Sequence, residues 1–237
     1  GGYPLSFLAK SDSDAFTWLA AYIRTYLEQD IPGLGISIPA DTLRRFWMML
    51  VHCHGNILNT AELARSFGIA DTTARRYLDL LSGTFMVRQL QPFIANIKKR
   101  QIRSPKIYFR DSGLLHQLMG VYDNSSLLTH IKCGASWEGF ALEQVVRLKA
   151  AHPSDCFFWG IHGQGEVDLL IRQRGKIEAF EFKYSSAPQA TKSMHVALQT
   201  LPIESLTVVA PVEERFYMAE RIAVSPLDGI VAEEQSN

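Results

Sequence analysis

Several features that would place this chain in a familiar class are scarce or missing. Its three cysteines, Cys53, Cys133 and Cys156, are odd in number, widely spaced and without a CxxC pair, which argues against a disulfide framework or a structural zinc site. A reducing cytoplasm suits such a chain. No apolar run approaches the length of a membrane-spanning helix, and the first residues lack the regions of a signal peptide. We therefore expect a soluble, cytoplasmic protein with no membrane partner.

Excess charge of one sign is also missing. The 24 lysines and arginines are matched by 24 aspartates and glutamates, so the overall balance gives no argument for nucleic-acid binding and local charge has to supply it. At 237 residues with 47% hydrophobic residues, the chain is long enough for one large or two small globular domains. The mixture of helical and strand patterns described below predicts an α+β protein.

The N-terminal half has mainly helical patterns. Apolar residues recur at helical spacing between Asp12 and Ile31 and again from Asp41, which predicts two helices with buried faces. Residues 60–69 form a short helix with Thr60 as its cap and a closing glycine turn, and Asp71 caps the next helix. Helix, glycine turn and polar-fronted helix is the helix-turn-helix pattern. We predict a helical winged-helix domain over residues 1–125, with the helix-turn-helix near 60–82 and the wing at 85–110.

The predicted wing is the most basic segment of the chain, because residues 88–110 contain seven lysines and arginines and no acidic residue. Such side chains on a loop can contact phosphates. The alternative is a solvated loop whose charge is balanced elsewhere. Since a helix-turn-helix directly precedes this segment, we favour contact with DNA or RNA, with DNA as the expected partner. The predicted contact residues, in the second helix and the wing, are Arg75, Arg76, Lys98, Lys99, Arg100 and Arg103.

The C-terminal half has alternating helix and strand patterns. The expected order is α, β, β, β, α, β, and a second domain is predicted over residues 126–237. The expected elements are a helix at 137–150, strands at 156–159, 166–171 and 176–184, a helix at 189–201 and a strand at 205–210.

Two of these strands carry the residues with the clearest chemistry. Strand alternation places Glu181 and Lys183 on one face, and it turns Val167, Leu169 and Ile171 away from Asp168. Glu166 shares a face with Asp168 and is a secondary candidate. Two carboxylates can hold a hard divalent ion such as Mg²⁺ or Mn²⁺, and a nearby lysine can neutralise charge on a phosphate. The alternative is a cross-strand charge pair without activity.

This order, with Asp168 on the second strand and Glu181-Phe182-Lys183 on the third, resembles the PD-(D/E)XK nuclease superfamily. The resemblance implies an α/β domain with an αβββαβ core and a mixed central sheet. It implies metal binding by Asp168 and Glu181, and Lys183 on the attacked phosphate. It also implies a metal-site glutamate from the first helix, for which Gly139 to Glu143 has the usual spacing. Glu138 lies about 140° away around the helix, so Glu143 is preferred, and all four residues are candidates for catalysis.

A wider resemblance covers most of the chain. The stretches 24–31, 104–115 and 166–183 are similar to the C-terminal half of prokaryotic AAA-type ATPases, in which an ATPase module precedes a winged helix and a nuclease-like domain. The chain starts with Gly1-Gly2 and has no GxxxxGK[ST] phosphate-binding loop. We therefore expect ATP to bind only in a preceding ATPase module, which would be a partner of this region; a homo-oligomer is left open.

Two functions follow from these patterns. The first is a magnesium-dependent DNA endonuclease region coupled to an ATPase. The second is an inactive module that docks the ATPase onto nucleic acid or a protein partner, with the nuclease-like fold as a scaffold. A third motif, His52-Cys53-His54, resembles a soft metal cluster, but neighbouring helical residues point in different directions, so we interpret it as a helix end.

Overall fold

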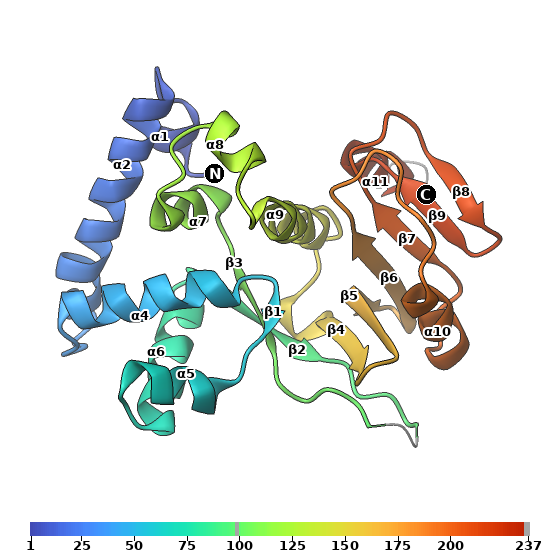
Figure 1. Ribbon diagram of the computed structural model, residues 1–237, viewed down its shortest axis with the longest axis horizontal. Helices are drawn as coiled ribbons and strands as arrows, with labels where there is room; N and C mark the ends of the chain where they lie inside the picture. The colour runs from blue at the N-terminus through green and yellow to red at the C-terminus, as the bar shows by residue number, and fades with distance from the viewer. Residues whose placement is uncertain (98–99, 235–237) are drawn as a thin grey trace. The chain divides into compact units, whose positions relative to one another are not determined.

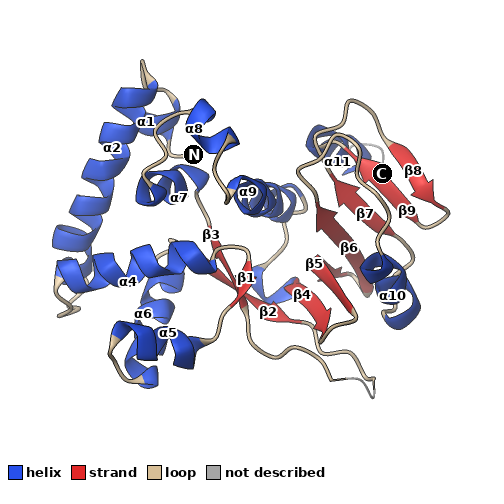
Figure 2. Cartoon of the chain, viewed as in Figure 1, coloured by secondary structure: helices blue, strands red, loops and turns tan. Residues whose placement is uncertain are grey.

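The computed structural model describes residues 1–97 and 100–234, and for residues 231–234 only the backbone. The chain forms two compact units. Unit 1 consists of Gly1–Gln89 and Ile107–Ser136, and unit 2 of Leu90–Lys106 and Trp137–Asn237. The sequence predicts a single boundary at 125/126, whereas the structure adds residues 90–106, from the predicted wing, to unit 2. Helices predominate in unit 1 and strands in unit 2 (Figure 2).

Unit 1 is built mainly of helices around an apolar core. Its largest fully buried side chains include Phe46 and Trp47 of α4, which pack with Leu27 and Ile31. The elements are α1 Pro4–Phe7, α2 Asp12–Thr25, a π-helical turn Tyr26–Asp30, α3 Ile31–Gly33, α4 Ala40–Cys53, β1 Asn56–Ile57, α5 Thr60–Phe67, α6 Asp71–Gly83, α7 Ser112–Met119 and α8 Asn124–Leu128. Strands β2 Val87–Pro92 and β3 Lys106–Phe109 begin in one unit and end in the other.

The α5–turn–α6 element has the order predicted for a helix-turn-helix. Gly68 takes the left-handed conformation, φ 76°, that ends α5. The caps differ from the prediction. The cap of α5 is Asn59, whose side chain accepts from the Glu62 N–H at 3.2 Å, so Thr60 is already helical. Asp71 is the first residue of α6, after Ala70.

Unit 2 is a mixed sheet with flanking helices (Figure 1). Its strand order is β2-β4-β5-β6-β7-β9-β8. The pairs β2/β4, β6/β7 and β7/β9 are parallel, and β4/β5, β5/β6 and β8/β9 are antiparallel. The elements are α9 Cys133–Leu148, a 3-10 turn Pro153–Asp155, β4 Cys156–Ile161, β5 Gly165–Gln173, β6 Lys176–Phe182, α10 Lys192–Thr200, β7 Leu206–Val209, β8 Phe216–Ala219, β9 Ile222–Ser225 and α11 Leu227–Glu234.

The predicted series α, β, β, β, α, β is present as α9, β4, β5, β6, α10 and β7. Beyond it, β8, β9 and α11 continue the unit, and the sequence did not predict them. The apolar core includes Met194 and Ala197 of α10, which pack with strand residues such as Trp159 and Val208. None of the helices in the described range combines the length and apolar composition needed to cross a bilayer.

Two parts of the predicted wing, at Phe93 and at Ile102, lie against β4. The Phe93 N–H donates to the Phe158 carbonyl at 2.6 Å, and the Ile102 N–H donates to the Gly160 carbonyl at 3.0 Å. The approach is so close that a Cβ on Gly160 would lie 2.6 Å from Ile102 Cδ1. These contacts make the segment part of the sheet unit, and they lead the chain to Lys106.

A β-bulge in β5 alters the side-chain alternation that the sequence predicts. Trp159 pairs with Val167 while Phe157 pairs with Leu170, so β5 has one residue more than β4 in this interval. Val167 and Leu170, three residues apart, consequently pack in the same apolar cluster. The extra residue redirects the chain at Asp168. Strict alternation through this strand was therefore a wrong expectation.

Candidate catalytic and metal-binding site

The candidate site lies where β5 and β6 diverge. The two strands pair from Gln173 and Lys176 as far as Leu169 and Phe180. Beyond that point β6 continues beside β7, and β5 continues beside β4. Asp168 stands at this fork, where its Oδ2 accepts a hydrogen bond from the Phe182 N–H at 3.1 Å. The Asp168 carboxylate thus takes the place of a backbone carbonyl as the acceptor for the Phe182 N–H, and this bond holds Asp168 beside the end of β6.

Lys106 is the basic centre of the site. Its side chain is only 3% exposed, and its Nζ lies 3.0 Å from Asp168 Oδ1. The same Nζ forms an ion pair with Glu166 Oε1 and lies 3.7 Å from Glu138 Oε1. Three carboxylates from α9 and β5 therefore surround one buried ammonium group, which also lies over the Phe158 ring. We refer to Lys106, Glu138, Glu166, Asp168, Glu181 and Lys183 as the acid–lysine cluster.

Glu181 and Lys183 point the same way, as strand alternation predicts. Lys183 Nζ lies 2.8 Å from Glu181 Oε1. The other oxygen, Glu181 Oε2, is buried and has no hydrogen-bond partner among the described residues. The Lys183 side chain is 40% exposed whereas that of Glu181 is 7% exposed, so Lys183 gives the cluster an open side toward solvent.

The two carboxyl groups at the fork have opposite pKa shifts. Burial raises the pKa of Glu181 to about 8, and the negative charge of Asp168 adds to this effect, against Lys183 and Lys106. For Asp168, burial acts to raise the pKa, but the charges of Lys106 and Lys183 and the Phe182 N–H outweigh it, so the pKa is lowered. Asp168 is therefore the ionised partner, and Glu181 holds a proton near neutral pH.

The backbone of the site is held by α10. Ser193 Oγ, in the first turn of this helix, accepts from the Glu166 N–H at 2.5 Å and donates to the Glu166 carbonyl at 2.9 Å. Gly165 permits this approach, because a Cβ there would lie 3.2 Å from Val196 Cγ1. The start of β5 is thus fixed by two hydrogen bonds next to the acid–lysine cluster.

The structure brings together Asp168, Glu181 and Lys183 of the predicted site, with the secondary candidate Glu166. Glu143 is buried on α9. In the described part of the chain, no three or more His, Cys, Asp or Glu side chains are arranged to hold a metal ion, so Asp168, Glu181 and Glu143 form no three-carboxylate set. The α9 glutamate beside Lys106 is Glu138, whereas helical spacing favoured Glu143 as the site residue.

Sequence reasoning assigned Lys106 to the charge of the wing and missed its place in the site. The available signal was its position at the start of Lys106–Phe109, a strand in which all four residues are buried. A lysine that opens a buried strand needs carboxylate partners nearby. Its partner Asp168 is 62 residues away in the chain, so the local sequence does not identify that carboxylate.

The predicted nucleic-acid residues are divided between the units. Arg75 and Arg76 are exposed on α6 of unit 1, and Arg75 Nε lies 2.8 Å from Asp71 Oδ2. Arg100 and Arg103 are exposed in unit 2. Lys98 and Lys99 lie outside the described residues.

Comparisons with known proteins give families but no described activity. Residues 1–125 match the family described as "Domain of unknown function (DUF8612)", and residues 133–230 match "Domain of unknown function (DUF4143)". Because the first match covers more than half of the 237 residues, the chain belongs to the DUF8612 family.

Two curated relatives are the uncharacterized proteins Mb2031c of Mycobacterium bovis and Rv2008c of Mycobacterium tuberculosis. Each is 48% identical over 231 residues, covering 98% of this chain and 52% of the relative. The chain thus spans about half the length of these relatives. A solved structure, "The crystal structure of transcriptional regulator PA3341", is 26% identical and covers 56% of this chain and 90% of its own, with a TM-score of 0.26. A TM-score this low supports no conclusion about fold.

Proposed function

We propose that unit 2 carries a divalent-cation-dependent site that hydrolyses phosphodiester bonds of DNA. The observation that supports this most is the pair Asp168 and Glu181 beside Lys183, with one buried carboxylate oxygen of Glu181 left without a partner. Buried polar atoms are nearly always hydrogen-bonded in folded proteins. An orphaned oxygen among carboxylates at the open side of a cluster is therefore a candidate ligand atom.

The residues present suit a hard cation. Magnesium needs only one or two protein carboxylates and completes its shell with water and substrate phosphate, so two carboxylates without a third suffice. Asp168 and Glu181 would hold it, with Glu143 added only by the family resemblance. When bound, the cation would polarise the phosphate and lower the pKa of a water molecule.

Each residue of the cluster has a role in this proposal. Lys183, the partly exposed cation, would bind a non-bridging phosphate oxygen and stabilise the charge that develops there. Glu181, whose pKa is raised to about 8, would give up its proton to solvent on binding the cation. Lys106 contacts Asp168 and Glu166 from a buried position and acts as a positioning residue for the carboxylates.

Unit 1 supplies the proposed DNA contact. The α5–turn–α6 element presents Arg75 and Arg76, both exposed, on its second helix, and such a helix can lie in the major groove. The proposed coupling to an AAA-type ATPase module rests on the family resemblance. Relatives about twice as long as this chain have room for that module.

Cleavage assays test this proposal. The parent chain, Asp168→Asn and Lys183→Gln would be incubated with plasmid and single-stranded DNA in Mg²⁺, in Mn²⁺ and in chelator. Glu178→Gln is the matched control, because Glu178 is an ion-paired carboxylate of unit 2 outside the acid–lysine cluster. We expect metal-dependent cleavage by the parent and the control, and a loss of at least roughly 100-fold in the two site variants. Absence of cleavage by the parent, or equal cleavage by all four proteins, would refute the enzyme proposal.

The second candidate is an inactive module that targets the ATPase to nucleic acid or to a protein. It is favoured by the observation that Lys106 and Lys183 already neutralise Asp168 and Glu181, as a structural charge network would. Calorimetric titration with Mn²⁺ separates the candidates. No Mn²⁺ binding by the parent, together with DNA binding that weakens in Arg75→Gln and Arg76→Gln, would favour the binding module.

A further inference from the structure

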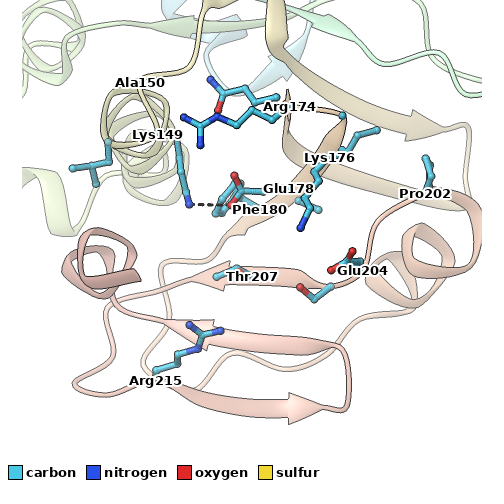
Figure 3. Close-up of a pocket in the computed structure, with 16 residues that line it drawn as sticks. Lys149, Ala150, Arg174, Lys176, Glu178, Phe180, Pro202, Glu204, Thr207 and Arg215 are labelled. Atoms are coloured by element: carbon cyan, nitrogen blue, oxygen red, sulfur yellow. Dashed lines mark ion pairs between the residues drawn. The ribbon is translucent and has the colours of Figure 1, made fainter. Parts of the chain in front are cut away.

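A second polar site lies at the other end of β6. It is a groove of about 850 Å³ in unit 2, within the size range of small-molecule sites. The walls come from the end of α9, the β5–β6 turn, the segment leading into β7 and the loop before β8 (Figure 3). Lys176 and Glu181 are five residues apart on one strand, about 17 Å along it, and the groove lining extends along β6 as far as Phe180. The two sites share no residue.

The groove is basic. Its lining includes four cationic side chains, Lys149, Arg174, Lys176 and Arg215, and two acidic ones, Glu178 and Glu204. Glu178 is engaged by Lys149, with Oε2 and Nζ 2.9 Å apart. Neither Arg174 nor Lys176 has an ion-pair partner among the described residues. The surplus of positive charge therefore lies around the β5–β6 turn.

The turn holds its two basic residues in a defined geometry. Gln173 pairs with Lys176, so only Arg174 and Gly175 form the turn. Both have left-handed backbones, with φ 51° for Arg174 and 77° for Gly175, which is the pattern of a tight two-residue hairpin. Glycine, asparagine or aspartate suits the first position better than arginine does. An arginine at this strained position is consistent with a functional use of its side chain.

The other walls supply complementary groups. In Figure 3, Lys176 and Arg215 extend from different segments toward Thr207 of β7, which lies between them. The hydroxyl groups of Ser205 and Thr207 add hydrogen-bond donors, and Ile177 and Pro202 add apolar surface. Arginine and lysine around hydroxyl groups suit phosphate oxygens, and the apolar wall suits an organic group attached to the phosphate.

We propose that this groove binds a phosphate-bearing ligand of nucleotide size, with Arg174, Lys176 and Arg215 as the phosphate-binding side chains. The phosphate could come from a free nucleotide or from a nucleic-acid strand, because both present the same anionic oxygens. The proposal does not depend on hydrolysis at the acid–lysine cluster.

Titration calorimetry tests the groove. The probes are pyrophosphate, a mixture of nucleoside triphosphates and a single-stranded DNA of twelve nucleotides. The variants are Arg174→Gly, which suits the left-handed backbone, and Lys176→Gln. Arg172→Gln is the matched control, since Arg172 is an exposed arginine of the same hairpin that does not line the groove. We expect each groove variant to weaken binding about tenfold, as the loss of one charged hydrogen bond does. The control should change it by less than about twofold.

The probes also distinguish the ligand sources. Binding of triphosphates that is lost in the groove variants supports a nucleotide, and binding of the DNA strand alone with the same loss supports a nucleic-acid strand. Failure of the parent to bind any probe would overturn the proposal, and so would equal weakening in Arg172→Gln, which indicates diffuse surface charge. The groove variants lie outside the acid–lysine cluster, so the outcome of the cleavage assay does not decide this test.

Discussion

His54 of unit 1 and the acid–lysine cluster of unit 2 bury polar groups in opposite ways. In unit 1, His54 is 2% exposed and both ring nitrogens are used. Its Nδ1 accepts from the Phe109 N–H at 3.0 Å, so Nε2 carries the proton and donates to the Ala135 carbonyl at 3.0 Å. Burial lowers the pKa of His54 to about 4, which keeps the ring neutral. A neutral, fully hydrogen-bonded group of this kind has a structural role.

Unit 2 instead buries charge and leaves it incompletely paired. Lys106 is surrounded by carboxylates, the pKa of Glu181 is raised, and one Glu181 oxygen has no partner among the described residues. Burying a charge costs desolvation free energy, and perturbed pKa values concentrate at functional sites. The comparison indicates that a neutral side chain with both ring nitrogens hydrogen-bonded belongs to the architecture of unit 1, whereas buried charge with an unpartnered carboxylate oxygen marks the candidate site of unit 2.

The largest expected effect on stability comes from replacing Lys106, the buried cation of the acid–lysine cluster. Lys106→Met keeps a similar volume but leaves Asp168 and Glu166 without their shared cation, so we expect the free energy of unfolding to fall by about 3–5 kcal/mol. The control Lys149→Met removes a lysine paired with Glu178, whose side chain is 46% exposed, and should cost only about 1 kcal/mol. Urea denaturation measures both. Equal losses would mean that the cluster is not a special electrostatic centre.

The next effect is the pH dependence of stability that arises from His54, the neutral buried side chain of unit 1. A histidine whose folded pKa of about 4 lies below its unfolded value contributes fully to stability at higher pH, and the contribution falls as pH drops from about 6.5 toward 4. The loss attributable to His54 should approach about 3 kcal/mol at the acid end. His116, whose pKa is also lowered to about 4, titrates in the same window.

Urea denaturation of the parent, His54→Gln and His116→Gln between pH 7 and 4 separates the two contributions. We expect a flatter profile in each variant than in the parent, because each change removes one histidine whose pKa is lowered to about 4. A His54→Gln profile as steep as that of the parent would contradict a neutral, buried His54.

A smaller effect is expected where Ile102 packs against Gly160 of β4. Gly160→Ala would place a Cβ 2.6 Å from Ile102 Cδ1, the end of a flexible side chain, so we expect a loss of about 1–2 kcal/mol. Ile102→Val removes that atom and should make Gly160→Ala less costly in a double-mutant cycle. Strictly additive losses would show that Ile102 does not pack on β4 in solution.

The smallest expected effect is on the surface of unit 1. Arg75→Gln removes one exposed ion pair within a helix, with Asp71, and should change the free energy of unfolding by less than about 0.5 kcal/mol. If α6 contacts DNA, the same change should weaken binding and reduce its salt dependence. Arg24→Gln, at an exposed arginine of α2, is the control. Equal weakening in both variants would locate no DNA contact on α6.

The order of elements was predictable because it depends on local patterns. Helical spacing and strand alternation gave α9 to β7 in sequence, and alternation also placed Glu181 beside Lys183. Alternation failed in β5, where the bulge at Asp168 depends on its register with β4. Register is set by the partner strand, which a local pattern does not contain.

The sequence by itself determined that Glu181 and Lys183 lie on one face, since their spacing within one strand fixes this. Only the tertiary structure decided that Lys106 and Glu138 join them, and that Arg174, Lys176, Lys149 and Arg215 line one groove. The physical reason is that these residues come from segments distant in the chain. Their encounters follow from strand order, a bulge and the hydrogen bonds that Phe93 and Ile102 form with β4, and all of these depend on packing between segments.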